Sequence, residues 1–216
     1  MEKKNLSDLE RELLKSLFQN SPAASDELEV RAFGDDSNQG VRYFVYYDVL
    51  DELTFASDYH DQPSIAVLLG GFSMDEKGAF IEVTGFTALE YMPDSSDLFE
   101  VIKGAVIEAI GELNQGATAG GRHVVGLYYG AAGNKGRLDE VIARAHLSLF
   151  NMPFQLAMIV DPEQECIGHY ARPVGGRFFN AGFSVVRMKT APGDEIVKVE
   201  EVKESDHEVR QDVDTE

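Results

Sequence analysis

One stretch decides the fold of this chain: VVGLYYGAAGNKGRLDEVIARAHLSLFNMPFQLAMIVDP, residues 124–162. An apolar run leads into a glycine-rich loop, and an amphipathic helix follows that we expect to end before Pro153. A second apolar run then breaks at Asp161 and Pro162. A strand that turns into a helix in this way places backbone amides where anions often bind. The turn therefore either carries catalytic or ligand-binding side chains or has only the backbone arrangement of such a site.

The segments around that stretch alternate between strand and helix patterns. Residues 64–72 form an apolar run, which predicts a strand buried on both faces, and the next strand should pair with it across a short turn. The expected strands are residues 41–50, 64–72, 79–92, 122–130, 154–162, 166–174 and 178–188, and the expected helices of this region are residues 97–116 and 136–150. This order predicts an α/β or α+β fold with a central sheet flanked by helices.

An amphipathic helix is expected before the first strand, over residues 5–18. Its leucines recur at intervals of three and four and form one apolar face, namely Leu6, Leu9, Leu13, Leu14 and Leu17. The face packs on the domain or docks on another subunit, and in the second case Leu13 and Leu17 are the candidate interface residues. Residues 20–27, NSPAASDE, have the composition of a linker.

The C-terminal end differs in composition from the rest. Residues 190–216 carry ten acidic and three basic side chains and no aromatic one, which predicts a disordered tail. Its part EIVKVEEV, residues 195–202, is the one candidate there for an additional edge strand. We therefore divide the chain into an N-terminal helix and linker (1–40), a folded domain (41–190) and an acidic tail (191–216).

Composition restricts the classes of function. The chain has 216 residues and a formal net charge of −19, which disfavours binding to nucleic acid or to an anionic membrane. It has one cysteine, Cys166, so no intrachain disulfide can form. No apolar run is long enough for a secretory signal or a membrane span. We expect a cytoplasmic protein.

The loop fails the test for a nucleotide-binding motif. A Walker loop requires G-x-x-x-x-G-K-[ST], whereas here Asn134 separates Gly133 from Lys135 and Gly136 follows the lysine. The hydroxyl that would bind magnesium is missing. We therefore expect no bound nucleotide.

The remaining chemistry-bearing residues show no catalytic pattern. The histidines form no H-x-H or H-x-x-x-H pair and are His60, His123, His146, His169 and His207. Cys166 has acidic neighbours, which raise a thiol pKa and disfavour a nucleophilic role. No G-x-S-x-G motif is present.

The same stretch resembles the MPN (JAB/JAMM) family. In that family a strand V-V-G-W-Y-H-S-H-P is followed by a loop, by S-x-x-D at the start of a helix, and by a strand ending in V-D-P. Here VVGLYYGAA, GRLDEVIARAHLSLF and FQLAMIVDP stand in that order. Upstream, PSIAVLLGGF is similar to the family's E-x-x-G-x-L-x-G segment, and downstream IGHYARPV is similar to its next strand. The resemblance covers residues 41–188 and implies an MPN-like central mixed β-sheet flanked by helices.

Carried over residue by residue, the resemblance implies a site without its metal ligands. The two histidines of active members fall on Tyr129 and Ala131, and the serine of S-x-x-D falls on Gly136. The upstream glutamate, the general base of active members, falls on Pro63, and only the aspartate remains, as Asp139. One carboxylate does not hold a catalytic zinc. Asp139 is then expected in the first turn of its helix, where a carboxylate meets the positive end of the helix dipole.

Three hypotheses remain. The first is a catalytically inactive MPN-like domain that needs no cofactor and acts as a structural or assembly subunit, with dimerisation on itself or on another MPN-like chain implied by the resemblance. The second is a diverged zinc-dependent isopeptidase or peptidase of the JAMM type whose ligands come from elsewhere, for instance His60, His123 and His169. The third is a binding module for a small molecule or peptide beside the loop.

Overall fold

The structure, a computed structural model, describes residues 19–20, 28–34, 40–58, 62–92, 97–115, 122–173 and 176–188. The helix expected over residues 5–18, with Leu13 and Leu17, and the acidic tail lie outside the described residues, as does His60.

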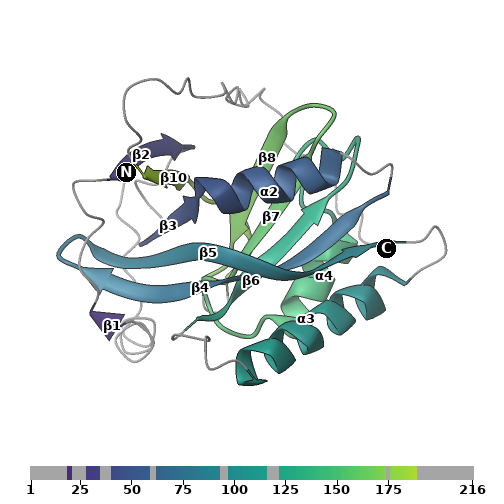
Figure 1. The fold of residues 1–216 in the computed structure, drawn as a ribbon, viewed down its shortest axis with the longest axis horizontal. Helices are drawn as coiled ribbons and strands as arrows, with labels where there is room; N and C mark the ends of the chain where they lie inside the picture. The colour runs from purple at the N-terminus through teal and green to yellow at the C-terminus, as the bar shows by residue number, and fades with distance from the viewer. Residues whose placement is uncertain are drawn as a thin grey trace, which may run out of the picture.

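A curled mixed sheet forms the centre of the molecule (Figure 1). Nine described strands follow one another in the order β2-β10-β3-β5-β4-β6-β7-β8-β9. Strand β1 pairs with the C-terminal end of β4. The pairs β1/β4, β10/β3, β3/β5 and β6/β7 are parallel and the others antiparallel. The strands are β1 (Gln19–Asn20), β2 (Leu28–Phe33), β3 (Val41–Tyr46), β4 (Ser64–Asp75), β5 (Gly78–Tyr91), β6 (His123–Gly130), β7 (Leu156–Asp161), β8 (Cys166–Ala171), β9 (Phe179–Asn180) and β10 (Phe183–Met188).

Three described helices cover the two faces of this sheet. Helix α2 (Tyr47–Asp58) lies on one face, and α3 (Leu98–Gln115) and α4 (Glu140–Leu149) lie on the other (Figure 1). Each face has its own apolar core, one that includes Val49, Leu50 and Leu53 of α2 and one that includes residues of both α3 and α4. The expected α+β fold, with a mixed sheet flanked by helices, is thus confirmed. Among the described residues, no helix combines the length and apolar character needed to cross a membrane.

Most expected elements are present close to their expected positions. Strand β4 is buried on both faces along Ser64–Gly70, as its apolar run predicts, and β5 returns beside it after a tight turn at residues 76–77. Helix α3 begins after Asp97, whose carboxylate accepts the N–H of Phe99 at 2.9 Å. The carboxylate caps the helix because the first backbone amides of a helix have no partner within it.

Three expectations for single elements were wrong. Residues 47–50 continue as helix α2 rather than as strand, because the buried positions change from alternate residues in β3 to the spacing of Val49, Leu50 and Leu53. The helix expected from residue 136 begins only at Glu140. Residues 178–188 form two strands rather than one. Strand β9 lies at one end of the sheet order, and β10 lies second from the other end. Strand β2, which pairs with β10, was not anticipated.

A bulge in β6 determines which of its side chains face which core. Leu68 pairs with Gly126 and Leu69 with Val124, so Val125 has no partner on β4. An extra residue reverses the alternation of side chains. Val125 and Tyr128 therefore face the core under α2, whereas Leu127 faces the core under α3 and α4.

Candidate functional site at the 131–139 loop

The structure brings three of the positions that the resemblance assigns to a metal site to one end of two neighbouring strands. Ser64 pairs with Gly130 and Ile65 with Tyr129. Pro63, just before β4, and Ala131, just after β6, therefore lie at the same end of this strand pair. Burial raises the pKa of the Tyr129 phenol, and the nearby carboxylate of Asp139 raises it further. A phenol with a raised pKa stays protonated at neutral pH and is a poor metal ligand.

Asp139 is the N-cap residue of α4 rather than a residue of its first turn. Its Oδ1 accepts the N–H of Ile142 at 2.8 Å, and its backbone oxygen accepts the N–H of Ala143 at 2.9 Å. A side-chain oxygen at this position satisfies one of the unpaired amides of the first turn, which contributes about 1 kcal/mol. Asp139, which the resemblance equates with the aspartate of S-x-x-D, therefore has a structural function.

The amides of the loop are occupied by side chains of the protein itself. The N–H of Lys135 donates to Asp161 Oδ2 at 2.8 Å, and the N–H of Gly136 donates to Asn134 Oδ1 at 2.7 Å. Asn134 also donates from Nδ2 to the backbone oxygen of Val160 at 2.9 Å. An anion at this loop would compete with these acceptors, in agreement with the failure of the Walker motif.

Asp161 holds the 131–139 loop and the turn before β8 together at the C-terminal end of β7. It is fully buried, and besides Lys135 it accepts the N–H of Gln164 at 3.2 Å in the turn before β8. Sequence reasoning treated Asp161 only as the residue where a strand breaks. No sequence signal identified Lys135 as its partner, because that residue lies 26 positions away on another loop.

At Gly136, the position that the resemblance equates with a serine, the structure leaves no room for a side chain. Its φ of 63° favours glycine, and a Cβ at this position would lie 2.8 Å from the amide nitrogen of Gly168. Its backbone oxygen accepts the hydroxyl of Tyr170 at 2.9 Å. The loop therefore packs directly on β8 by backbone contact.

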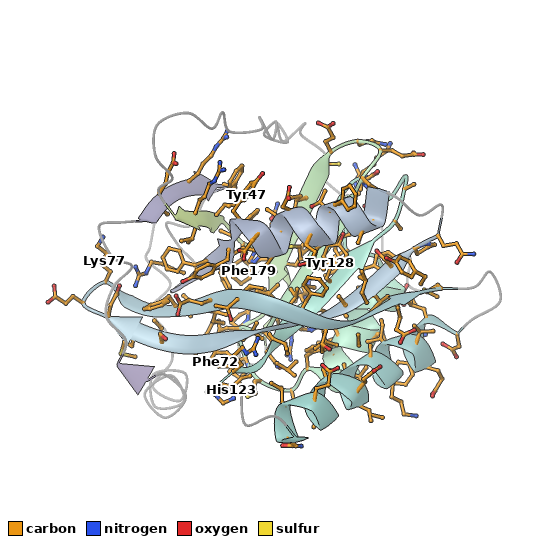
Figure 2. The ribbon with its side chains drawn as sticks, in the orientation of Figure 1. Tyr47, Phe72, Lys77, His123, Tyr128 and Phe179 are labelled. Atoms are coloured by element: carbon orange, nitrogen blue, oxygen red, sulfur yellow. The ribbon has the colours of Figure 1, made fainter. Side chains whose placement is uncertain are left out.

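A second polar group that the sequence did not suggest lies behind the loop, on the side of α2. Tyr128 lies between the sheet and α2 (Figure 2), and its hydroxyl interacts with Ser57 and donates to the backbone oxygen of Leu53 at 3.1 Å. Ser57 also bonds Ser64, 2.8 Å away. Burial raises the pKa of Tyr128 to about 12. The network is complete within itself, and a Cβ on Gly130 would collide with all three hydroxyls.

Two histidines are buried and neutral. Nε2 of His146 lies 3.2 Å from the backbone oxygen of Leu156, and Nδ1 of His169 lies 3.2 Å from that of Ala181. Burial lowers the pKa of each to about 4. Stacking on Phe150 and Phe183, respectively, holds the rings in the core.

The other residues weighed for metal or thiol chemistry are dispersed. His123 is exposed at the start of β6 beside Phe72 (Figure 2), whereas His169 is in the core. Within the described ranges no three His, Cys, Asp or Glu side chains are grouped so that they could hold a metal ion. Cys166 is buried at the start of β8, and burial and the carboxylate of Asp161 both raise the pKa of its thiol.

The fold and site define an α+β protein with a curled mixed sheet and a loop bound to the ends of β7 and β8. Neither a family model nor a curated protein matches the chain. Among solved structures, the chain is similar to the solution structure of protein DSY2949 from Desulfitobacterium hafniense, with a TM-score of 0.45 and 12% sequence identity over 69% of this chain and 95% of that one. The name of that protein states no activity.

Proposed function

We propose that this chain is a catalytically inactive MPN-like domain that acts as a structural or assembly subunit in the cytoplasm. The observation that carries the proposal is the convergence of Pro63, Tyr129 and Ala131 at one end of β4 and β6, next to Asp139. These are the positions that the family resemblance assigns to its metal site, and they come from segments far apart in the sequence. A proline, a phenol and a methyl group offer no ligand set for zinc, and Asp139 caps α4.

An assembly subunit requires a surface for its partner, and α3 has an apolar one. Ile107 and Ile110 point away from the core and are 61% and 46% exposed. Gly104 and Gly111 of the same helix have no atom near the position of an added Cβ, so another helix could approach its backbone closely. We propose that this face of α3 binds a second MPN-like chain or another copy of this one. The net charge of −19 makes nucleic acid an unsuitable partner.

The test combines two variants in the full chain. Ile107→Asp with Ile110→Asp places charges in the proposed interface, and we expect loss of self-association or partner capture, measured by analytical ultracentrifugation and affinity purification from the native host. Asp139→Asn removes the carboxylate but keeps an oxygen that can cap α4, and should leave assembly unchanged. Assembly that survives the isoleucine variant in a folded protein would refute the interface.

The alternative, a zinc-dependent isopeptidase or peptidase of the JAMM type, makes the opposite prediction. It expects about one zinc per chain by elemental analysis and cleavage of an isopeptide or peptide bond that Asp139→Asn abolishes. The proposed function expects substoichiometric zinc and a melting temperature that chelation does not lower, because no fold-stabilising ligand set would be emptied.

A further inference from the structure

Two apolar side chains of β5 and β10 are buried outside both cores. Phe80 of β5 and Val186 of β10 are each only 3% exposed, yet neither belongs to the core under α2 or to the core under α3 and α4. Phe44 of β3 meets Phe80 edge to face at a centroid distance of 5.5 Å. These three residues, Phe44, Phe80 and Val186, are called the half-sheet patch below.

The half-sheet patch lies on the same face of the sheet as α3 and α4. Val41, Tyr43 and Val45 of β3 face the core under α2, so the alternate residues of this strand face the other way. Phe80 pairs with Arg42, and Val186 follows Val185, which faces the core under α2, so both share that face. The core built by α3 and α4 includes none of the three. The guanidinium of Arg42 lies over the rings of Phe44 and Phe80, but the described helices do not account for the burial of this half of the sheet.

The chain's own N-terminal segment ends beside this patch. Gln19 in β1 pairs with Ser73 of β4, and Ser73 pairs with Phe80 of β5. Since neighbouring strands lie about 4.8 Å apart, Gln19 lies roughly 10 Å from Phe80. A helix of the 14 residues 5–18 would be about 21 Å long, which suffices to cross β4, β5 and β3 and to reach β10.

The chemistry of the segment matches that of the patch. Leu6, Leu9, Leu13, Leu14 and Leu17 form one apolar face at helical spacing, and an isolated amphipathic helix of this length is marginal in water without a surface to cover. We propose that residues 5–18 dock as a helix on the half-sheet patch of the same chain, beside α3. The leucine face thereby completes a third apolar layer and is not available to another subunit.

The first experiment measures hydrogen exchange by mass spectrometry on the full chain with Leu13→Asp and Leu17→Asp. We expect amides of β3, β10 and the first half of β5 to exchange roughly tenfold faster or more, while α3 keeps its protection. The control, Arg11→Gln with Lys15→Gln, changes net charge by the same −2 on the opposite helix face and should leave exchange unchanged. Unchanged exchange in the leucine variant, or faster exchange in α3 instead, would overturn the proposal.

A second measurement does not depend on a destabilising substitution. In a Cys166→Ser background, a nitroxide at Ala32→Cys, which shares the patch face through its pairing with Ser184, should broaden the methyl signals of Leu13 and Leu17. A nitroxide at Ile107→Cys is the comparison for docking on α3. Stronger broadening from position 107 would overturn the proposal. So would broadening from position 32 that appears only between chains, in a mixture of isotopically labelled and nitroxide-bearing protein.

Discussion

Single residues at the 131–139 loop serve the architecture through contacts that would otherwise suit a ligand. Asp161 accepts amides from two loops, Asn134 folds its own loop, and Asp139 caps a helix. Buried carboxylates that accept backbone amides are ordinary structural elements when every oxygen has a donor. The polar character of the loop thus reflects its attachment to β7 and β8.

Asp161→Ala should destabilise the fold by about 1–3 kcal/mol, because the amides of Lys135 and Gln164 lose the buried carboxylate that accepts them. Chemical denaturation measures the change. Glu163→Ala, an exposed residue of the same turn, is the control and should remain within about 0.5 kcal/mol of the unmodified chain. A similar small effect for Asp161→Ala would show that the loop does not depend on this carboxylate.

His146 and His169 should make stability depend on pH. Each has a folded-state pKa of about 4, below the ordinary 6.5, so the unfolded chain takes up their protons first. The stabilisation is fully present above pH 6.5 and is lost as pH falls from 6.5 towards 4. Between pH 7.5 and pH 5 each histidine should lower the free energy of unfolding by about 2 kcal/mol.

The measurement is denaturation between pH 7.5 and pH 5, compared with His169→Phe. That variant removes one of the two protonation sites and should show a shallower fall in the free energy of unfolding by about 2 kcal/mol. An identical pH dependence in both proteins would mean that His169 is not neutral and buried in solution.

At the scale of elements, hydrophobic periodicity predicted helices and strands correctly, whereas residue composition led to one wrong prediction. The apolar runs of β4, β6 and β7 and the amphipathic pattern of α3 predicted their elements correctly. Residues 41–50 have the aromatic and β-branched composition of a strand, but from Tyr47 the buried positions follow a helix. Composition describes a preference of about 1 kcal/mol or less per residue, which tertiary packing of α2 on the sheet exceeds.

The central strands should tolerate cavities poorly. Val125, Leu127, Leu156, Met158 and Val160 of β6 and β7 are all at most 1% exposed. Leu156→Ala in β7 should cost about 2–5 kcal/mol, measured by chemical denaturation. Ile110→Ala on the exposed side of α3 is the comparison and should cost far less. Equal effects would contradict the assignment of β7 to the centre of the sheet.

At the scale of the whole molecule, the charge of −19 is concentrated partly in the acidic C-terminal residues. Deleting residues 204–216 should leave the melting temperature nearly unchanged, because so polar a segment buries too little apolar surface to offset the entropy of ordering. Thermal unfolding of the full and shortened chains measures this. A large fall would show that the tail belongs to the fold.

The sequence by itself determined the α+β class, the hairpin of β4 and β5, helix α3 and the β6-loop-α4-β7 unit, because each depends on short-range periodicity and on Gly, Pro and Asp at fixed positions. Only the tertiary structure decided that Val125 and Leu127 face opposite cores, since one bulged residue reverses the alternation of side chains. It likewise decided that β2 pairs with β10 and that Asp161 joins two loops. Such contacts depend on the relative positions of segments distant in the chain, which no local pattern encodes.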